Sequence, residues 1–73
     1  MENISIMAKI QLNGKKIKIS KGLNISRLLK KYKLNEKKIA IELNGAILPK
    51  NHYVQKKLKD NDKIEIVQFI GGG

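Results

Sequence analysis

The chain has 73 residues, no cysteine, one histidine and a formal net charge of +10, from 16 basic residues against six acidic ones. A chain this short forms one domain with a thin core, which favours a carrier or binding module over an enzyme with a deep pocket. Without cysteine there is no disulfide, thiolate nucleophile or thiolate metal site, and one imidazole excludes a histidine cluster. The apolar runs are too short to span a membrane, so we expect a cytoplasmic protein.

The positive charge suggests either a nucleic acid or an acidic protein surface as partner. Fifteen of the 16 basic residues are lysines spread along the chain, and Arg27 is the only arginine. Arginine clusters and interleaved aromatic residues, the usual means of contacting bases and phosphates, are missing. This pattern favours solvated lysines, and a basic nucleic-acid-binding module is the alternative from another class.

Residues 8–12 alternate between apolar and polar, as do residues 15–20, and Asn13-Gly14 stands between them. Alternation with a period of two indicates strands with one buried face. The Asn-Gly pair fits the tight type I′ turn, which needs positive φ at both positions. The sequence predicts a β-hairpin, preceded by an N-terminal lead over residues 1–7.

A helix is predicted after Asn24, a residue type that caps helix N-termini. Its apolar positions follow the spacing i, i+3, i+4 and i+7, which places them on one face: Ile25, Leu28, Leu29 and Tyr32. We expect this face to pack on the sheet. Lysines near the end of the helix suit its negative C-terminal pole.

A third strand is predicted over residues 39–43, followed by the turn signal Asn44-Gly45 and a short strand over residues 46–48 that Pro49 ends. Residues 50–58 are predicted to be irregular or briefly helical. Three side chains of this segment are expected to cover one end of the core: Tyr53, Val54 and Leu58.

Asp60 and Asp62 could be a carboxylate pair for metal or acid–base chemistry, but aspartates of this spacing more often form turns, and no third ligand is visible. The last strand is predicted over residues 63–68. Strict alternation places Val67 and Phe69 on its outer side, where two apolar side chains suggest a partner-docking face. The alternative is a twist that buries Phe69.

Three glycines, Gly71, Gly72 and Gly73, end the sequence. Glycine has no Cβ, so such a segment adopts backbone angles and passes through gaps that are closed to other residues. We interpret residues 69–73 as a flexible tail that presents the Gly73 carboxylate. An ordinary frayed terminus is the alternative.

The predicted order is hairpin, helix, strand, short strand, strand over residues 8–68. It describes an α+β domain with one main helix on a mixed sheet of four to five strands.

Three segments together resemble the ThiS family of sulfur carrier proteins of thiamine biosynthesis: IELNGAILPK from Ile41, DNDKIEIVQ from Asp60, and the terminal glycines. The resemblance implies a ubiquitin-like β-grasp fold. The chain departs from the family pattern in several places. Asn61 replaces a usual glycine, His52-Tyr53 lies where many members have tryptophan, Gly71 is additional, and the charge is unusually basic.

The resemblance also implies a function in which the chain binds no cofactor or metal and has no catalytic residue. An E1-like, ThiF-type enzyme would use ATP to adenylate Gly73, with Gly71 and Gly72 threading into its site. Cysteine-derived sulfur, supplied by a cysteine desulfurase or sulfurtransferase, would then give a thiocarboxylate for a ThiG-type thiazole synthase. A sulfur carrier for molybdopterin synthesis and a ubiquitin-like protein modifier are the alternatives.

Overall fold

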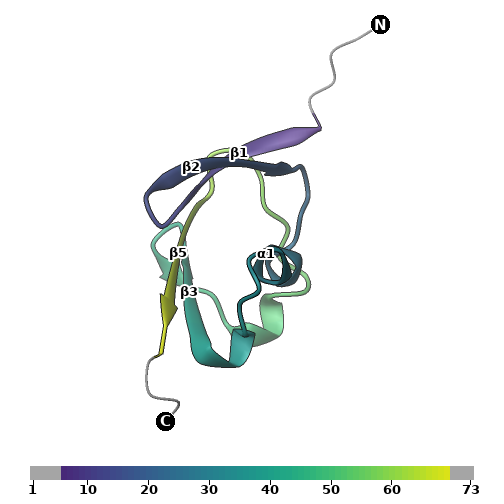
Figure 1. The fold of residues 1–73 in the computed structure, drawn as a ribbon. Helices are drawn as coiled ribbons and strands as arrows, with labels where there is room; N and C mark the ends of the chain where they lie inside the picture. The colour runs from purple at the N-terminus through teal and green to yellow at the C-terminus, as the bar shows by residue number, and fades with distance from the viewer. Residues whose placement is uncertain (1–5, 70–73) are drawn as a thin grey trace, which may run out of the picture.

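The computed structural model describes residues 6–69, which form a five-stranded mixed sheet with one α-helix against one of its faces (Figure 1). The strand order is β2-β1-β5-β3-β4. The elements are β1 (Met7–Leu12), β2 (Lys15–Ser20), α1 (Ile25–Lys31), the 3₁₀ helix η1 (Glu36–Lys38), β3 (Ile39–Leu43), β4 (Ala46–Ile47), the 3₁₀ helix η2 (Lys50–His52) and β5 (Lys63–Gln68). The predicted α+β architecture is confirmed.

The N-terminal hairpin forms as predicted, with β1 starting at Met7, one residue earlier than expected. Its turn has positive φ at both central positions, 47° at Asn13 and 85° at Gly14. This is the backbone that a type I′ turn requires. The turn sets a register in which Ile10 lies opposite Ile17, so both apolar sides of the hairpin face α1.

Helix α1 begins at the predicted cap, where the Arg27 backbone N–H donates to the Asn24 Oδ1 at 2.7 Å. Ile25, Leu28 and Leu29 are buried against the sheet, but Tyr32 is 41% exposed. The prediction was wrong for Tyr32 because the helix ends there. Lys33 takes a φ of 57°, which turns the chain before the apolar stripe reaches its next turn.

The segment after β4 contains the short helix η2 and closes one end of the core with Tyr53 and Leu58, as predicted. Val54 is 68% exposed, so its predicted place in the core was wrong. The preceding residue, Tyr53, already fills the inward position, and its carbonyl accepts from the Ser26 N–H at 3.0 Å.

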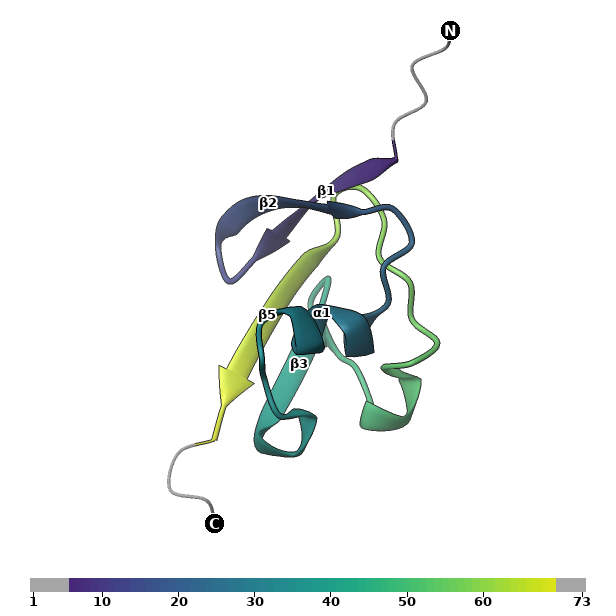
Figure 2. The same ribbon diagram turned by 45° about the vertical axis from the view of Figure 1, so that its right-hand side comes forward.

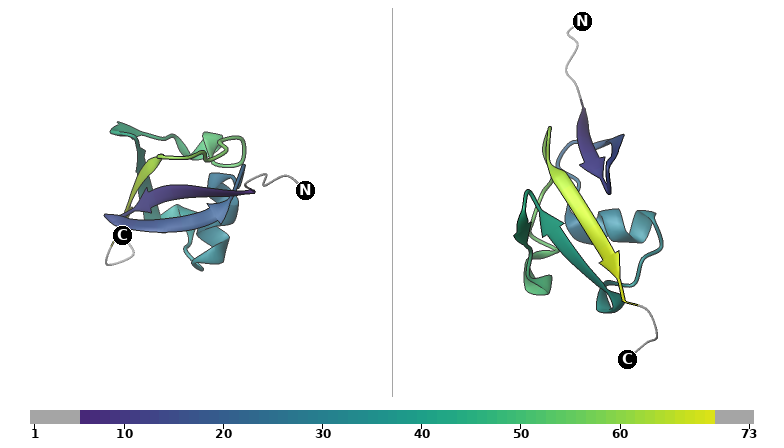
Figure 3. Two further views of the ribbon diagram at one scale, coloured as in Figure 1. Left: turned by 90° about the horizontal axis from the view of Figure 1, so that it is seen from above. Right: turned by 90° about the vertical axis from the view of Figure 1, so that its left-hand side faces the viewer.

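The core lies between α1 and one face of the sheet, and the opposite face carries no helix (Figures 2 and 3). Its buried residues come from every major element: Ala8, Ile10, Ile19, Ile25, Leu28, Leu29, Ile39, Ile41, Leu43, Tyr53, Leu58 and Ile64. No helix within residues 6–69 is long and apolar enough to cross a membrane.

Candidate functional site

The last strand, β5, is the central strand of the sheet and leads into the glycine tail. It pairs with β1 in parallel and with β3 in antiparallel orientation. Gly71, Gly72 and Gly73, the predicted threading and modification residues, lie outside the described residues. The structure therefore shows how the strand before the tail is held.

On the β3 side the pairing is continuous, from Leu43 opposite Ile64 to Ile39 opposite Gln68. It extends one residue beyond the strand, since the Phe69 N–H donates to the Lys38 carbonyl at 2.8 Å. The chain is therefore fixed up to Phe69 on this side.

On the β1 side the backbone pairing is short, because β1 turns away at Asn13. The Asn13 N–H donates to the Ile64 carbonyl at 2.8 Å. Its side chain then continues the ladder: Oδ1 accepts from the Ile66 N–H at 2.6 Å, and Nδ2 donates to the Ile66 carbonyl at 3.3 Å. One amide side chain thus does what the next residue of a strand would do.

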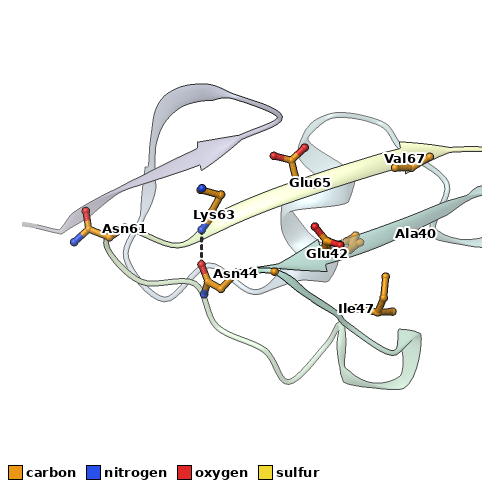
Figure 4. A pocket seen from close by; sticks show the side chains of 10 residues that line it. Ala40, Glu42, Asn44, Ile47, Asn61, Lys63, Glu65 and Val67 are labelled. Carbon is orange, nitrogen blue, oxygen red and sulfur yellow. Dashed lines mark hydrogen bonds between the residues drawn. The ribbon is translucent and has the colours of Figure 1, made fainter.

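The second Asn-Gly turn fixes the start of β5 in a similar way (Figure 4). The Asn44 N–H donates to the Lys63 carbonyl at 2.7 Å, and its Oδ1 accepts from the Lys63 N–H at 2.8 Å. Its Nδ2 donates to the Asp62 Oδ1 at 3.0 Å. Both turns were predicted from the sequence, but these side-chain roles were not. The only signal was that asparagine, rather than aspartate or glycine, precedes each turn glycine.

Asp62 is buried, with 2% of its surface exposed, and serves the turn before β5. Besides Asn44, it accepts from the Lys59 backbone N–H at 2.9 Å and from the Lys59 Nζ at 3.2 Å. Burial raises the pKa of Asp62, but the hydrogen bonds and the positive charge of Lys59 outweigh burial, so its pKa lies below the ordinary value. The carboxylate is ionised at neutral pH.

The structure supports the turn interpretation of the two aspartates over the metal interpretation. Asp60 Oδ1 accepts from the Lys9 N–H at 2.8 Å, so each carboxylate is engaged by backbone donors of its surroundings. Within residues 6–69 there is no group of three or more ligating side chains that could hold a metal.

Tyr53 is the other group with a shifted pKa. Burial and, secondly, the negative charge of Glu36 raise the pKa of this phenol, and a hydrogen bond involving Ile41 only partly offsets them. Tyr53 therefore stays neutral and acts as part of the core.

The uncovered face of the sheet has a shallow hollow across β3, β4 and β5 (Figure 4). Val67 lies here and is 60% exposed, and Phe69, two residues further, is 55% exposed. The twist that would bury Phe69 does not occur, and both residues are accessible as expected. Ile47, 69% exposed opposite Glu42, adds an apolar side chain that sequence reasoning missed.

A family model described as the ThiS family matches residues 7–73. The chain belongs to the ThiS family. The chain is 45% identical over 65 residues to the sulfur carrier protein ThiS of Bacillus subtilis, an alignment that covers 88% of the chain and 98% of that protein. The predicted family, a family of sulfur carriers of thiamine biosynthesis, is confirmed.

A crystal structure of the thiamine biosynthesis protein ThiS from Geobacter metallireducens superimposes with a TM-score of 0.76 at 31% identity. The match covers 89% of the chain and 99% of that protein, and it confirms the predicted β-grasp fold. The chain is also 40% identical over 65 residues to a thiazole synthase of Paramagnetospirillum magneticum. This alignment covers 89% of the chain but only 20% of that longer protein.

Replacing Asn13 by glycine tests the side-chain link to β5, because glycine keeps the positive φ but removes the amide. We expect Asn13→Gly to lower the free energy of unfolding by about 1–3 kcal/mol, the worth of two hydrogen bonds, and to speed amide exchange at Ile66. Denaturant titration and hydrogen exchange measure these effects.

Asn61→Gly is the matched control. Asn61 also has a positive φ, 71°, but its side chain forms no hydrogen bond within residues 6–69. The free energy of unfolding of Asn61→Gly should differ from that of wild type by less than about 0.5 kcal/mol. Equal losses in the two variants would show that the Asn13 amide contributes nothing specific.

Asp62 should make the free energy of unfolding depend on pH in the acidic range. Because its folded pKa is lowered, its contribution is complete above the unfolded value of about 3.9 and is lost as pH falls through the lower folded value. Asp62→Asn should cost about 1–3 kcal/mol at pH 7. The difference in free energy of unfolding between wild type and Asp62→Asn should shrink as the pH falls below about 4.

Urea unfolding at a series of pH values measures this difference. Asp60→Asn removes the same charge from an exposed neighbour and keeps an oxygen for the Lys9 N–H, so it should cost less at pH 7. A difference between wild type and Asp62→Asn that stays constant down to pH 2 would contradict the assignment.

Proposed function

We propose that this protein carries sulfur as a thiocarboxylate on Gly73 and donates it to the thiazole ring of thiamine. Membership of the ThiS family, with a match that runs to the terminal glycines, is the observation that carries this proposal. The geometry supports it, because the tail follows the central strand, which is bonded on both sides. A body held in this way can dock while the tail reaches into another protein.

The terminal carboxylate is suited to activation by ATP. An α-carboxyl group titrates near pH ~3.5, so at neutral pH it is an anion that can attack phosphorus. Attack on the α-phosphate of ATP releases pyrophosphate and gives an acyl-adenylate. A thiol, such as excess cysteine, reduces the persulfide sulfur of the desulfurase to hydrosulfide and becomes part of a disulfide. The hydrosulfide then forms the C–S bond, and AMP leaves with the electron pair of the broken C–O bond. The chain itself is a co-substrate in these steps.

The length of the tail is sufficient for delivery into a partner's site. Four residues follow the fixed Phe69, and a segment of four residues spans at most about 13–14 Å when fully extended. Glycines at the end allow this segment to enter a narrow passage, because no side chain has to be accommodated. The adenylating enzyme would supply the ATP site, and the adenylating enzyme and the thiazole synthase would supply the catalytic groups.

The relatives support a thiazole synthase as the acceptor of the sulfur. In Paramagnetospirillum magneticum and in Magnetococcus marinus, a protein named thiazole synthase contains a segment similar to this chain. A carrier-like segment and the synthase therefore share one polypeptide there. We infer that a thiazole synthase receives the sulfur from the present protein, and that the E1-like adenylating enzyme acts first.

Intact mass spectrometry tests the proposal directly. After incubation with ATP, a ThiF-type adenylating enzyme, a cysteine desulfurase and cysteine, the protein should gain the mass difference of one oxygen exchanged for one sulfur. A variant without Gly73 should show no gain. No gain in the full chain, with enzymes that modify another ThiS protein under the same conditions, would refute the proposed function.

Gly72→Val tests whether the tail has to thread into the enzyme. We expect thiocarboxylate formation to fall by about 100-fold, because a β-branched side chain shifts the reacting carboxylate from its position. The melting temperature should stay unchanged. Ala46→Val, the same kind of change in the edge strand β4, should react normally, and normal reaction of Gly72→Val would contradict threading.

A further inference from the structure

The two tight turns of the sheet share a dipeptide with a covalent chemistry of its own. Asn13-Gly14 joins β1 to β2, Asn44-Gly45 joins β3 to β4, and all four residues are exposed. Asparagine before glycine is prone to deamidation, because glycine has no side chain to hinder attack by its backbone nitrogen. At the other asparagines of the described chain the next residue carries a side chain: Asn24, Asn35, Asn51 and Asn61.

Deamidation converts the asparagine amide into an acid without an enzyme. The Gly14 nitrogen attacks the Asn13 Cγ, and the new C–N bond closes a succinimide ring. The Cγ–Nδ2 bond breaks, and its nitrogen leaves as ammonia with the electron pair of that bond and the proton of the Gly14 amide. Water then adds to either ring carbonyl and opens the ring. The products are aspartate, with the original backbone, and isoaspartate, whose backbone is longer by a methylene group.

The attacking nitrogen is equally available in both turns. Neither the Gly14 nor the Gly45 N–H donates a hydrogen bond to any part of the chain that the structure describes. Both glycines have a positive φ, 85° and 88°, and open space where a Cβ would lie. A difference in reactivity between the turns therefore has to come from how each asparagine side chain is held.

The Asn44 amide is held firmly. Its Nδ2 donates to the buried Asp62 carboxylate at 3.0 Å, and its Oδ1 accepts from the Lys63 N–H at 2.8 Å (Figure 4). Hydrogen bonds to an ionised acceptor are stronger than those between neutral groups. The negative charge of Asp62, which Lys59 offsets in part, also opposes the anionic intermediate of the attack. Both effects protect Asn44.

The Asn13 amide is held less firmly. Its Nδ2 donates to the neutral Ile66 carbonyl at 3.3 Å, a long hydrogen bond, and its Oδ1 bond at 2.6 Å ends on the same residue. The pairing of β1 with β5 covers two residue pairs, against five between β3 and β5, so a small opening frees the whole amide. Lys15 and Lys16 follow Gly14 directly, and their positive charges favour the anionic intermediate.

We propose that Asn13 is a site of spontaneous deamidation in the folded protein, and that the modification loosens β5 ahead of the tail. Isoaspartate lengthens a turn that has only two residues between its strands. Aspartate has no N–H for the Ile66 carbonyl and sets a carboxylate beside it. Either product removes the amide that takes the place of a strand residue next to Ile66. The reaction does not depend on the sulfur-carrier function.

Peptide mass mapping of the full chain during incubation in mildly alkaline buffer tests the site. At each turn it follows the mass difference between an amide and an acid. In the folded protein, Asn13 should react faster than Asn44 by about ten-fold or more. In guanidinium chloride, which removes the hydrogen bonds of both turns, the two rates should agree within about three-fold.

Asp62→Asn is the matched variant, because it removes the charged acceptor of Asn44 and leaves both Asn-Gly pairs in place. It should raise the rate at Asn44 by about ten-fold and leave the rate at Asn13 within about three-fold of wild type, since Asn13 reacts through a local opening. The chain modified at Asn13 has a lower net positive charge and separates on a cation exchanger. Its Ile66 amide should exchange about ten-fold faster than in the unmodified chain.

Three results would overturn the proposal. The first is an equal or faster rate at Asn44 in the folded wild type. The second is no reaction at Asn13 in the folded protein over a time that converts the unfolded chain, which would show that the turn itself prevents the attack. The third is unchanged amide exchange at Ile66 in the modified chain, which would show that β5 does not depend on the Asn13 amide.

Discussion

The fold depends on how the backbone of β5 is satisfied on the side where its neighbour ends. A central strand with unpaired N–H and C=O groups would lose the hydrogen bonds that make it rigid. β1 stops pairing at Leu12, and the Asn13 amide supplies the donor and acceptor that Ile66 then needs. Asn44 does the same for Lys63 at the beginning of the strand. The element that leads to the tail is thus held at both its start and its middle.

The two turn asparagines meet a local and a long-range requirement with one residue type. Each has a positive φ, 47° at Asn13 and 51° at Asn44, a conformation that asparagine tolerates better than most residues. Glycine would meet that requirement but has no side chain, and aspartate would lack the N–H donor. Agreement between turn chemistry and sheet pairing at the same positions is the consistency expected of a sequence with one well-defined fold.

The sequence was informative where a single element decides the outcome. The alternation of residues 8–12, 15–20 and 63–68 and the cap at Asn24 led to correct elements, because period and capping are local. Tyr32 and Val54 were misplaced since their burial depends on where a short helix stops and which of two adjacent residues turns inward. The Glu42–Glu65 pair could not be predicted, because it depends on the register between β3 and β5, which are separated by residues 44–62. For Gly73 the chemistry is only what the family resemblance implies, and residues 6–69 show how the strand before the tail is supported.

The two faces of the sheet obey different constraints, and this explains why the buried face was easier to predict from the sequence than the exposed one. The face toward α1 must exclude water, so its residues are apolar in strict alternation, and burial alone accounts for them. The other face meets no such demand, and stability would be served best by alternating charges. It carries like charges side by side and exposed apolar residues at Ile47, Val67 and Phe69 instead. Natural proteins accept losses of this kind mainly where a surface serves function. The departures from optimal stability are thus concentrated on the one face of the sheet that does not have to exclude water.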